Sequence, residues 1–284
     1  MSYPIARIDP TTAGRERSPS LWRNELEKYS ADKSLGVLRA DDFTEPQSVS
    51  GAGALSTNGR WWMAEAGTTG ATSETANTTT DPNGVLHLLG TTGTDFIGVE
   101  VQAGSSATLI ENIVLPTATT NAKGTVVFEA RVYLDTAAND TFFVGLAEAG
   151  STVLTGDNTL TLAADYIGFY RLDAANLLFI SRNDNNTGTA VSSSQIIKTT
   201  AQVAAGYEDA YVKLGFRVNY DNTVEVFVDS VRIRKDSSDA VVTVASTALP
   251  IEKLTRKVSV CRGATLNNAT VSVDIDWIDC WVAE

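Results

Sequence analysis

The one histidine of the chain, His87, is the side chain best suited to acid–base chemistry, because imidazole titrates near neutral pH. A Ser-His-Asp or Cys-His system for nucleophilic catalysis would have to use it. The neighbours of His87 in residues 85–89 are all apolar, and the chain has no Gly-X-Ser-X-Gly nucleophile elbow. We therefore interpret His87 as an ordinary strand residue and predict no catalytic residues of this type.

Side chains that bind metals are few and widely spaced. Two cysteines, Cys261 and Cys280, and one histidine do not form a zinc-binding pattern. Residues 138–141 and 183–188 are rich in oxygen ligands for calcium, but Asn, Asp and Gly are also the usual residues of hairpin turns. We interpret both segments as turns and expect neither a metal nor a cofactor. The cysteines are expected to be free and buried on a final hairpin that turns near residues 267–268, with a disulfide as the alternative.

Two aspartates near the C-terminus, Asp274 and Asp276, have the spacing that places carboxylates on one face of a strand. They would lie about 6–7 Å apart along that strand. A retaining glycosidase holds its two carboxyl groups about 5–5.5 Å apart and raises the pKa of one of them. A solvated strand face explains the two aspartates without catalysis, so the chain is predicted not to be an enzyme.

Stacking on sugar rings requires exposed aromatic side chains, and Trp61 and Trp62 are the candidates. Adjacent residues of a strand point to opposite faces, so one of the two indoles is expected to face outward. Large rings in β-sandwiches mostly lie in the core or in an interface. Glycan stacking on Trp61 or Trp62 is therefore kept as the alternative to a packing role.

Charge and hydropathy argue against two classes of partner. The chain has 34 acidic and 22 basic residues, a net charge of −12, so it does not attract a phosphate backbone and we expect no nucleic-acid partner. No run approaches the roughly 18 apolar residues of a membrane span, and the first residues lack the apolar stretch of a signal peptide. We expect no membrane contact and no export signal.

Residues 1–40 form a predicted N-terminal arm, distinct from the rest in its prolines and basic residues. A short amphipathic helix is expected within it, with Ser18 as N-cap, Pro19 at the first helical position and an end near Lys33. A helix this short is marginal alone, so its apolar stripe needs a surface, either its own sandwich or a neighbouring subunit. The stripe, spaced i, i+4, i+7, consists of Trp22, Leu26 and Tyr29.

Residues 41–284 show short runs with the period of two that is typical of β-strands with one buried face. The clearest run is 125–135, and 211–221 followed by 223–229 indicates a tight hairpin at Asp221-Asn222. More than a dozen such runs without helices between them predict an all-β, two-sheet antiparallel jelly-roll sandwich. The other expected strands are residues 85–89, 96–102, 108–115, 141–148, 166–171, 177–182, 190–198, 231–234, 241–245, 257–262 and 270–282, with residues 67–84 as a long loop.

Three of these runs, 128–134, 212–233 and 273–282, together resemble the concanavalin A-like lectin/glucanase superfamily, especially its laminin-G-like branch. Ser230 stands where that family usually has glycine at the end of the hairpin. The resemblance implies a jelly roll and a role involving glycans. Its hydrolases carry a Glu-X-Asp-X-Glu motif in mid-chain, whereas the nearest match here, Asp274 to Asp279, replaces both glutamates by aspartate and lies near the end of the sequence.

The Pro-punctuated arm and the Thr/Ala/Gly/Asn-rich sandwich also resemble bacteriophage virion proteins, above all capsid decoration (cement) proteins. This second resemblance implies a non-enzymatic protein on the capsid surface, made in the host cytoplasm. It would be anchored to the major capsid protein or another virion protein by Trp22, Leu26 and Tyr29, as a homo-oligomer for which a trimer is the first expectation. The alternative is a carbohydrate-binding module of a tail fibre or adhesin that recognises a surface glycan, and the third possibility is a glycoside hydrolase.

Overall fold

The computed structural model describes most of the chain in segments. These are residues 17–23, 25–43, 48–50, 60–67, 74–78, 85–90, 97–104, 111–117, 124–134, 140–156, 159–172, 177–184, 196–198, 211–233, 244, 246–262 and 271–283.

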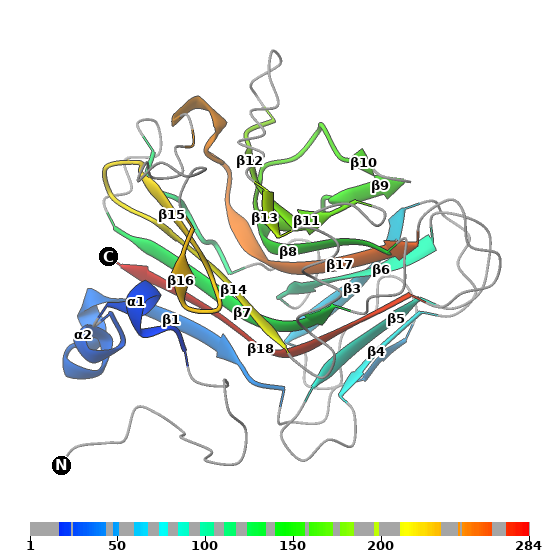
Figure 1. The fold of residues 1–284 in the computed structure, drawn as a ribbon, viewed down its shortest axis with the longest axis horizontal. Helices are drawn as coiled ribbons and strands as arrows, with labels where there is room; N and C mark the ends of the chain where they lie inside the picture. Colours follow the sequence, from blue (N-terminus) through cyan, green and yellow to red (C-terminus); the bar gives the residue numbers. More distant parts are fainter. Residues whose placement is uncertain are drawn as a thin grey trace.

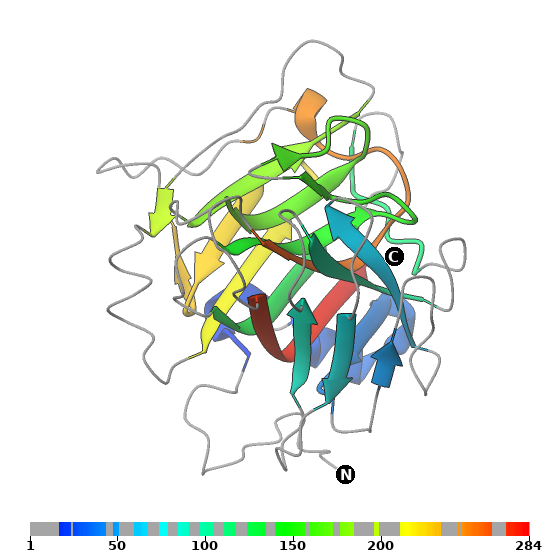
Figure 2. The ribbon, with the colours of Figure 1, turned by 90° about the vertical axis from the view of Figure 1, so that its right-hand side faces the viewer.

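Two antiparallel sheets stacked face to face make up the molecule, as Figures 1 and 2 show from two directions. The nine-stranded sheet has the order β16-β15-β14-β7-β18-β5-β4-β2, with β1 paired to β18 beyond this path. Its strands are β1 (Gly36–Asp41), β2 (Ser48–Ser50), β4 (Glu74–Thr78), β5 (Leu86–Gly90), β7 (Val126–Leu134), β14 (Val212–Val218), β15 (Val224–Val228), β16 (Val231–Arg232) and β18 (Val271–Ala283).

The seven-stranded sheet has the order β13-β12-β11-β8-β17-β6-β3, and a small hairpin, β9–β10, lies over its outer side (Figure 1). Its strands are β3 (Trp61–Gly67), β6 (Ile97–Ala103), β8 (Asp140–Glu148), β11 (Tyr166–Arg171), β12 (Leu177–Arg182), β13 (Ile196–Lys198) and β17 (Leu254–Arg262). The hairpin consists of β9 (Leu154–Gly156) and β10 (Thr159–Leu160). The predicted all-β jelly-roll sandwich is confirmed.

The core lies between the two sheets and is built from one face of each strand. In β7 the even-numbered residues from Val126 to Val132, such as Phe128, are buried in this core, as the alternation of the sequence predicts. Phe128 stacks on Phe216 of β14 with ring centroids 5.0 Å apart, and Phe179 of β12 approaches Phe216 from the opposite sheet at 5.6 Å. These rings connect the two sheets across the core. Because side chains alternate along a strand, the odd-numbered residues of β7 point to the outer face.

The hairpin β14–β15 is confirmed, with Val218 opposite Val224. Asn222 has a φ of 67° in its turn. The next turn, from β15 to β16, places Asp229 and Ser230 at φ values of 48° and 69°. Positive φ at both central residues of a two-residue hairpin turn is the reason that glycine is favoured there. Ser230 therefore adopts the backbone conformation that the related hairpins give to glycine.

The N-terminal helix is present in two pieces, α1 (Pro19–Trp22) and α2 (Glu25–Ala31), followed by a 3-10 turn, η1 (Lys33–Leu35). Arg23 at the end of α1 has a φ of 34°, which interrupts the single helix that the sequence predicts. Residues 36–40 were assigned to the arm, but they belong to β1, which pairs with β18. None of the described helices is long and apolar enough to cross a membrane.

The predicted final hairpin is wrong, because β17 and β18 lie in different sheets. Cys261 and Cys280 are not joined in a disulfide, and both are buried, on the outer side of one sheet and in the core respectively. In the expected strand 108–115, the described residues form only a bridge between Ile113 and Leu254. Strand β4 lies inside the segment expected to be a loop. Of the expected strand 241–245, all but residue 244 lies outside the described residues, and a second 3-10 turn, η2 (Ser246–Ala248), follows.

Candidate functional site

The outer face of the nine-stranded sheet carries an unusual set of charged and aromatic side chains. Strand β18 is the source of most of them, because a bulge between Ile275 and Trp277 inserts one residue opposite β7. Ile275 and Ile278 on either side of the bulge both remain in the core. The bulge thereby adds an outward-facing side chain to β18. The outer face of β18 presents Asp274, Asp276, Trp277, Asp279 and Trp281.

The open half of this face is centred on His87 of β5 and Asp274 of β18, which are directly opposed in the sheet. The imidazole Nδ1 lies 2.5 Å from Asp274 Oδ1, and the two side chains are 28% and 29% exposed. The hydrogen bond to Asp274 raises the pKa of His87 above its ordinary value, against the opposing effect of burial. The structure thus pairs two residues that the sequence analysis considered separately.

The His87–Asp274 pair can be tested by pH titration. The His87 pKa is raised in the folded state, so protonated His87 stabilises the folded protein. This contribution to folding stability is complete below the ordinary pKa of 6.5 and is lost as the pH rises through the higher folded value. Asp274→Asn is expected to lower the His87 pKa to or below 6.5, since only the effect of burial then remains. The ring protons can be followed by NMR, and a single histidine makes the assignment unambiguous. An unchanged pKa in Asp274→Asn would show that the pair does not form in solution.

Two tyrosines lie beside this pair. Tyr133 of β7 is opposite Asp274, and its ring meets that of Tyr211 edge to face with centroids 5.8 Å apart. Both tyrosines are half-buried. The guanidinium of Arg131 lies 4.4 Å from the centre of the Tyr211 ring and forms a buried ion pair with Asp276. Arg131 therefore fixes the tyrosine ring and holds the second predicted carboxylate away from solvent.

The other half of the outer face, around Glu129 and Asp279, is covered by the N-terminal segment and is called the covered half. Glu129 of β7 and Asp279 of β18 are directly opposed, an arrangement in which like charges repel. Arg17 forms an ion pair with Asp279, while Glu129 accepts hydrogen bonds from the Ser18 hydroxyl, the Ser18 N–H at 3.1 Å and Trp22 Nε1 at 2.8 Å. Burial raises the pKa of both carboxyl groups despite these partners. The segment 17–22 thus supplies the cation and the donors that these two carboxylates need.

Two of the three predicted anchoring residues, Trp22 and Leu26, lie in this covered half. Trp22 is only 3% exposed and packs with Val127 and Trp281 of its own sandwich, and Leu26 packs partly buried against the same cluster. The side chain of Tyr29 lies outside the described residues. The premise that Trp22 waits for a partner surface is therefore wrong, because the outer face of β7 and β18 already provides an apolar floor and a hydrogen-bond acceptor.

Trp61 and Trp62, the alternative stacking residues, point to opposite faces of β3, as expected. Trp61 is buried in the core, where its Nε1 donates to Asp41 at 2.7 Å, so its ring is not available for stacking on a ligand. Trp62 is half-buried on the outer side of the seven-stranded sheet. A half-buried ring pair on the outer face is instead formed by Tyr133 and Tyr211, which sequence reasoning missed. Strand alternation placed both rings outward, but only the pairing of β7 with β14 brings them together.

In the described segments, no group of three or more His, Cys, Asp or Glu side chains is arranged to hold a metal ion. The two oxygen-rich turns that were weighed as calcium sites are only partly covered by these segments, since residues 138–139 and 185–188 lie outside them.

No protein-family model and no curated protein matches the sequence, but many solved structures resemble the fold. A pseudo β-1,3-glucanase and immunostimulatory antigen of Mycobacterium tuberculosis is 13% identical with a TM-score of 0.50, over 86% of this chain and 98% of that one. An endo-1,3-β-glucanase of Streptomyces sioyaensis is 14% identical with a TM-score of 0.46, over 88% and 97%. The carbohydrate recognition domain of Emp47p is 14% identical with a TM-score of 0.43, over 88% and 97%.

The likeness to the mycobacterial protein shows that the chain has a concanavalin A-like jelly-roll fold. The prediction that the chain is not an enzyme does not stand, because the chain shares its fold with the mycobacterial protein that is described as a pseudo β-1,3-glucanase. The absence of a familiar motif from the sequence was too weak a ground for it. The virion setting stays a prediction, since these structures do not bear on it.

Proposed function

We propose that the chain binds carbohydrate on the open half of the outer face, through Tyr133, Tyr211 and the His87–Asp274 pair. The observation that carries the proposal is the half-exposed ring pair, with centroids 5.8 Å apart, next to the half-exposed imidazole and carboxylate. Aromatic rings present a large apolar surface to the C–H face of a sugar, while carboxylate and imidazole can hydrogen-bond its hydroxyl groups. A few polar groups beside aromatic surface are typical of small-ligand sites.

The support of Arg131 makes this surface rigid before a ligand arrives. Its guanidinium lies over the Tyr211 ring and is held in turn by Asp276, so neither side chain has to be ordered on binding. Preorganisation of this kind reduces the entropy cost of association. The fold supports the same function by analogy alone, since the mycobacterial protein that shares it is named a pseudo β-1,3-glucanase.

The proposal is tested by measuring binding of β-glucan oligosaccharides and a glycan array to single-site variants. Tyr133→Ala and Tyr211→Ala are each expected to weaken binding about threefold to tenfold, since aromatic contacts contribute about 0.5–1.5 kcal/mol. Tyr220→Ala is the matched control, because Tyr220 is 73% exposed on the β14–β15 hairpin and is away from the ring pair. Equal loss in all three variants, or binding by none of the proteins, would refute the proposed site.

Glycoside hydrolysis is the second candidate, favoured by the position of Asp274 beside a hydrogen-bonded His87 on this same face. A carboxylate and an imidazole in contact can move a proton during bond cleavage. The same oligosaccharides report on it through release of reducing ends. Cleavage that is lost in Asp274→Asn would assign the chain to the hydrolases, whereas binding without cleavage would leave recognition as its function.

The biological setting rests on the sequence resemblance alone. A phage tail fibre or adhesin module that recognises a surface glycan agrees better with a covered Trp22 than does a capsid-anchored arm. The virion partners, the trimer and the capsid location stay predictions.

A further inference from the structure

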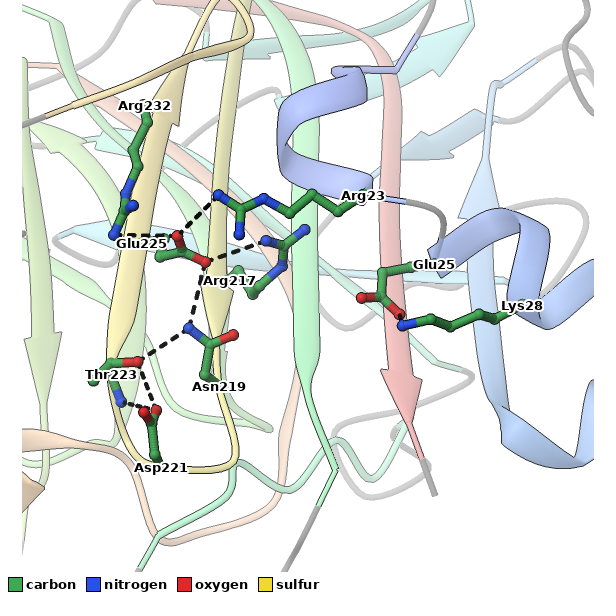
Figure 3. A network of polar contacts seen from close by, with 9 residues as sticks. All are labelled: Arg23, Glu25, Lys28, Arg217, Asn219, Asp221, Thr223, Glu225 and Arg232. Atoms are coloured by element: carbon green, nitrogen blue, oxygen red, sulfur yellow. Dashed lines mark hydrogen bonds and ion pairs between the residues drawn. The ribbon is translucent and has the colours of Figure 1, made fainter.

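Three arginines surround one carboxylate near the β16 edge of the nine-stranded sheet, away from His87 of β5 (Figure 3). Glu225 of β15 accepts from Arg217 of β14 at 3.2 Å and pairs with Arg232 of β16 at 3.1 Å and Arg23 at 3.6 Å. Asn219 donates to the same carboxylate at 3.4 Å. These contacts bring three positive charges to one negative charge, in a chain whose net charge is −12.

Two described carboxylates near this cluster are engaged with other groups, although the charge of Glu25 also acts on Arg217 and opposes the lowering of its pKa. Glu25 forms an ion pair with Lys28 at 3.1 Å. Asp221 accepts from the backbone N–H and the hydroxyl of Thr223 at 3.1 and 2.6 Å, in the turn of the hairpin. Figure 3 shows Arg217 and Arg23 side by side between the hairpin and helix α1.

Arg217 carries the strongest sign of a missing ligand. Only 4% of its side chain is exposed, and its Nε and one Nη are buried without a hydrogen-bond acceptor among the described residues. A buried donor that lacks an acceptor costs about 1–3 kcal/mol, and more when it is charged. Burial also lowers the pKa of Arg217, against the opposing effect of Glu225. The guanidinium therefore lacks an anionic acceptor beyond Glu225.

We propose that Arg23, Arg217 and Arg232 form a binding site for an oxyanion, the sulfate or carboxylate group of an acidic glycan. Guanidinium groups bind such groups through two parallel hydrogen bonds, and Arg217 has two donors free for this purpose. Arg23 can move aside to admit the group, because its side chain is 56% exposed and it makes the longest of the three contacts with Glu225. Only the choice of a glycan as the carrier rests on the proposed function.

The oxyanion site is separate from the proposed stacking surface. Arg217 lies six residues beyond Tyr211 along β14, or about 20 Å, and β15 lies four strand spacings, about 19 Å, from β5 across the sheet. Helix α1 lies between the two sites, since Leu21 fills the space above Gly215 of β14 where any larger residue would overlap it. The two sites can therefore be tested independently.

The test measures binding of sulfated dextran and of neutral dextran of the same length by isothermal titration calorimetry. The double variant Arg23→Gln/Arg232→Gln is expected to bind sulfated dextran at least about tenfold more weakly, with the affinity of the unsubstituted chain falling as salt is added. Lys33→Gln/Lys253→Gln is the matched control, because both lysines are exposed and it removes the same two charges elsewhere. Thermal unfolding of both variants verifies that they are folded.

Glu225→Gln gives a result of opposite sign. Removing the carboxylate that competes for the three arginines should tighten binding of sulfated dextran, whereas a merely structural network would only lose stability. Titration with sodium sulfate distinguishes a free sulfate ion from a sulfate group carried by a sugar. Heat of binding that depends on Arg23 and Arg232 would show that the free ion suffices. Heat with sulfated dextran alone would show that the sugar carrier is needed.

Equal affinity in the two double variants, or no binding of either sulfated probe, would overturn the oxyanion site. Tyr133→Ala and Tyr211→Ala should weaken binding of neutral β-glucan without altering the binding of sodium sulfate, and the arginine substitutions should not alter binding of neutral glucan. Failure of the oxyanion site and failure of the proposed glucan site are thereby distinguished.

Discussion

Replacing Lys257 by alanine is expected to lower the free energy of unfolding by about 3–5 kcal/mol, because it leaves a buried charge without its partner. Lys257 is fully buried, forms an ion pair with Glu100 at 3.0 Å and donates to the carbonyl oxygens of Glu148 and Ser151. Glu100, 2% exposed, would keep the Ser259 hydroxyl and the Val153 N–H as its donors among the residues that the structure describes. Urea denaturation followed by circular dichroism measures the loss.

Two controls define this result. Lys253→Ala, at an exposed lysine just before β17, is expected to change stability by no more than about 0.5 kcal/mol. The double variant Glu100→Gln/Lys257→Met should lose less than Lys257→Ala, since removing both charges avoids the isolated carboxylate. A double variant as unstable as the single one would mean that the lysine acts through packing and not through its charge.

Replacing Trp22 by alanine is the second large effect, with an expected loss of about 3–5 kcal/mol. The indole is 3% exposed against the outer face of the nine-stranded sheet, and its N–H donates to Glu129 at 2.8 Å. Its removal would leave a cavity above Val127 and Trp281 and would take one donor from a buried carboxylate. Thermal and urea unfolding of the full chain measure the change.

Trp22→Phe separates the two contributions, because the phenyl ring fills most of the space but cannot donate to Glu129. It should lose about 1–3 kcal/mol, the cost of an unsatisfied buried acceptor. If Trp22→Ala unfolded at the same urea concentration as the unsubstituted chain, the N-terminal segment would not be docked on its own sandwich in solution. Trp22 would then lack a surface on its own sandwich, as the anchoring arm expected from the sequence requires.

The sequence predicts the parts of this molecule that depend on one strand at a time. The alternation in β7 assigned Phe128 to the core and Tyr133 to the outside, and the turn residues at Asp221-Asn222 predicted the hairpin that the structure contains. A period of two reports which face of a strand is buried, but not which strand lies beside it. For that reason β17 and β18 were expected to pair, although they lie in opposite sheets.

The candidate sites depend on pairing between distant segments, which explains why they were missed. His87 and Asp274 are 187 residues apart, and each alone resembles an ordinary strand residue. The three arginines around Glu225 come from the residue after α1, from β14 and from β16, and only the folded chain brings them together. Trp22 was recognised as needing a surface, but the surface itself forms only when β7 lies beside β18.

The placement of β18 has a consequence for how the protein is made. This strand, red in Figures 1 and 2, pairs with β7, β5 and β1, all of which precede it in the sequence. While the ribosome is still translating the preceding residues, these three strands have unpaired edges where β18 will later lie. Stable folding of this layer must therefore wait until residues 271–283 leave the exit tunnel, and the emerging polypeptide needs protection from edge-to-edge association until then.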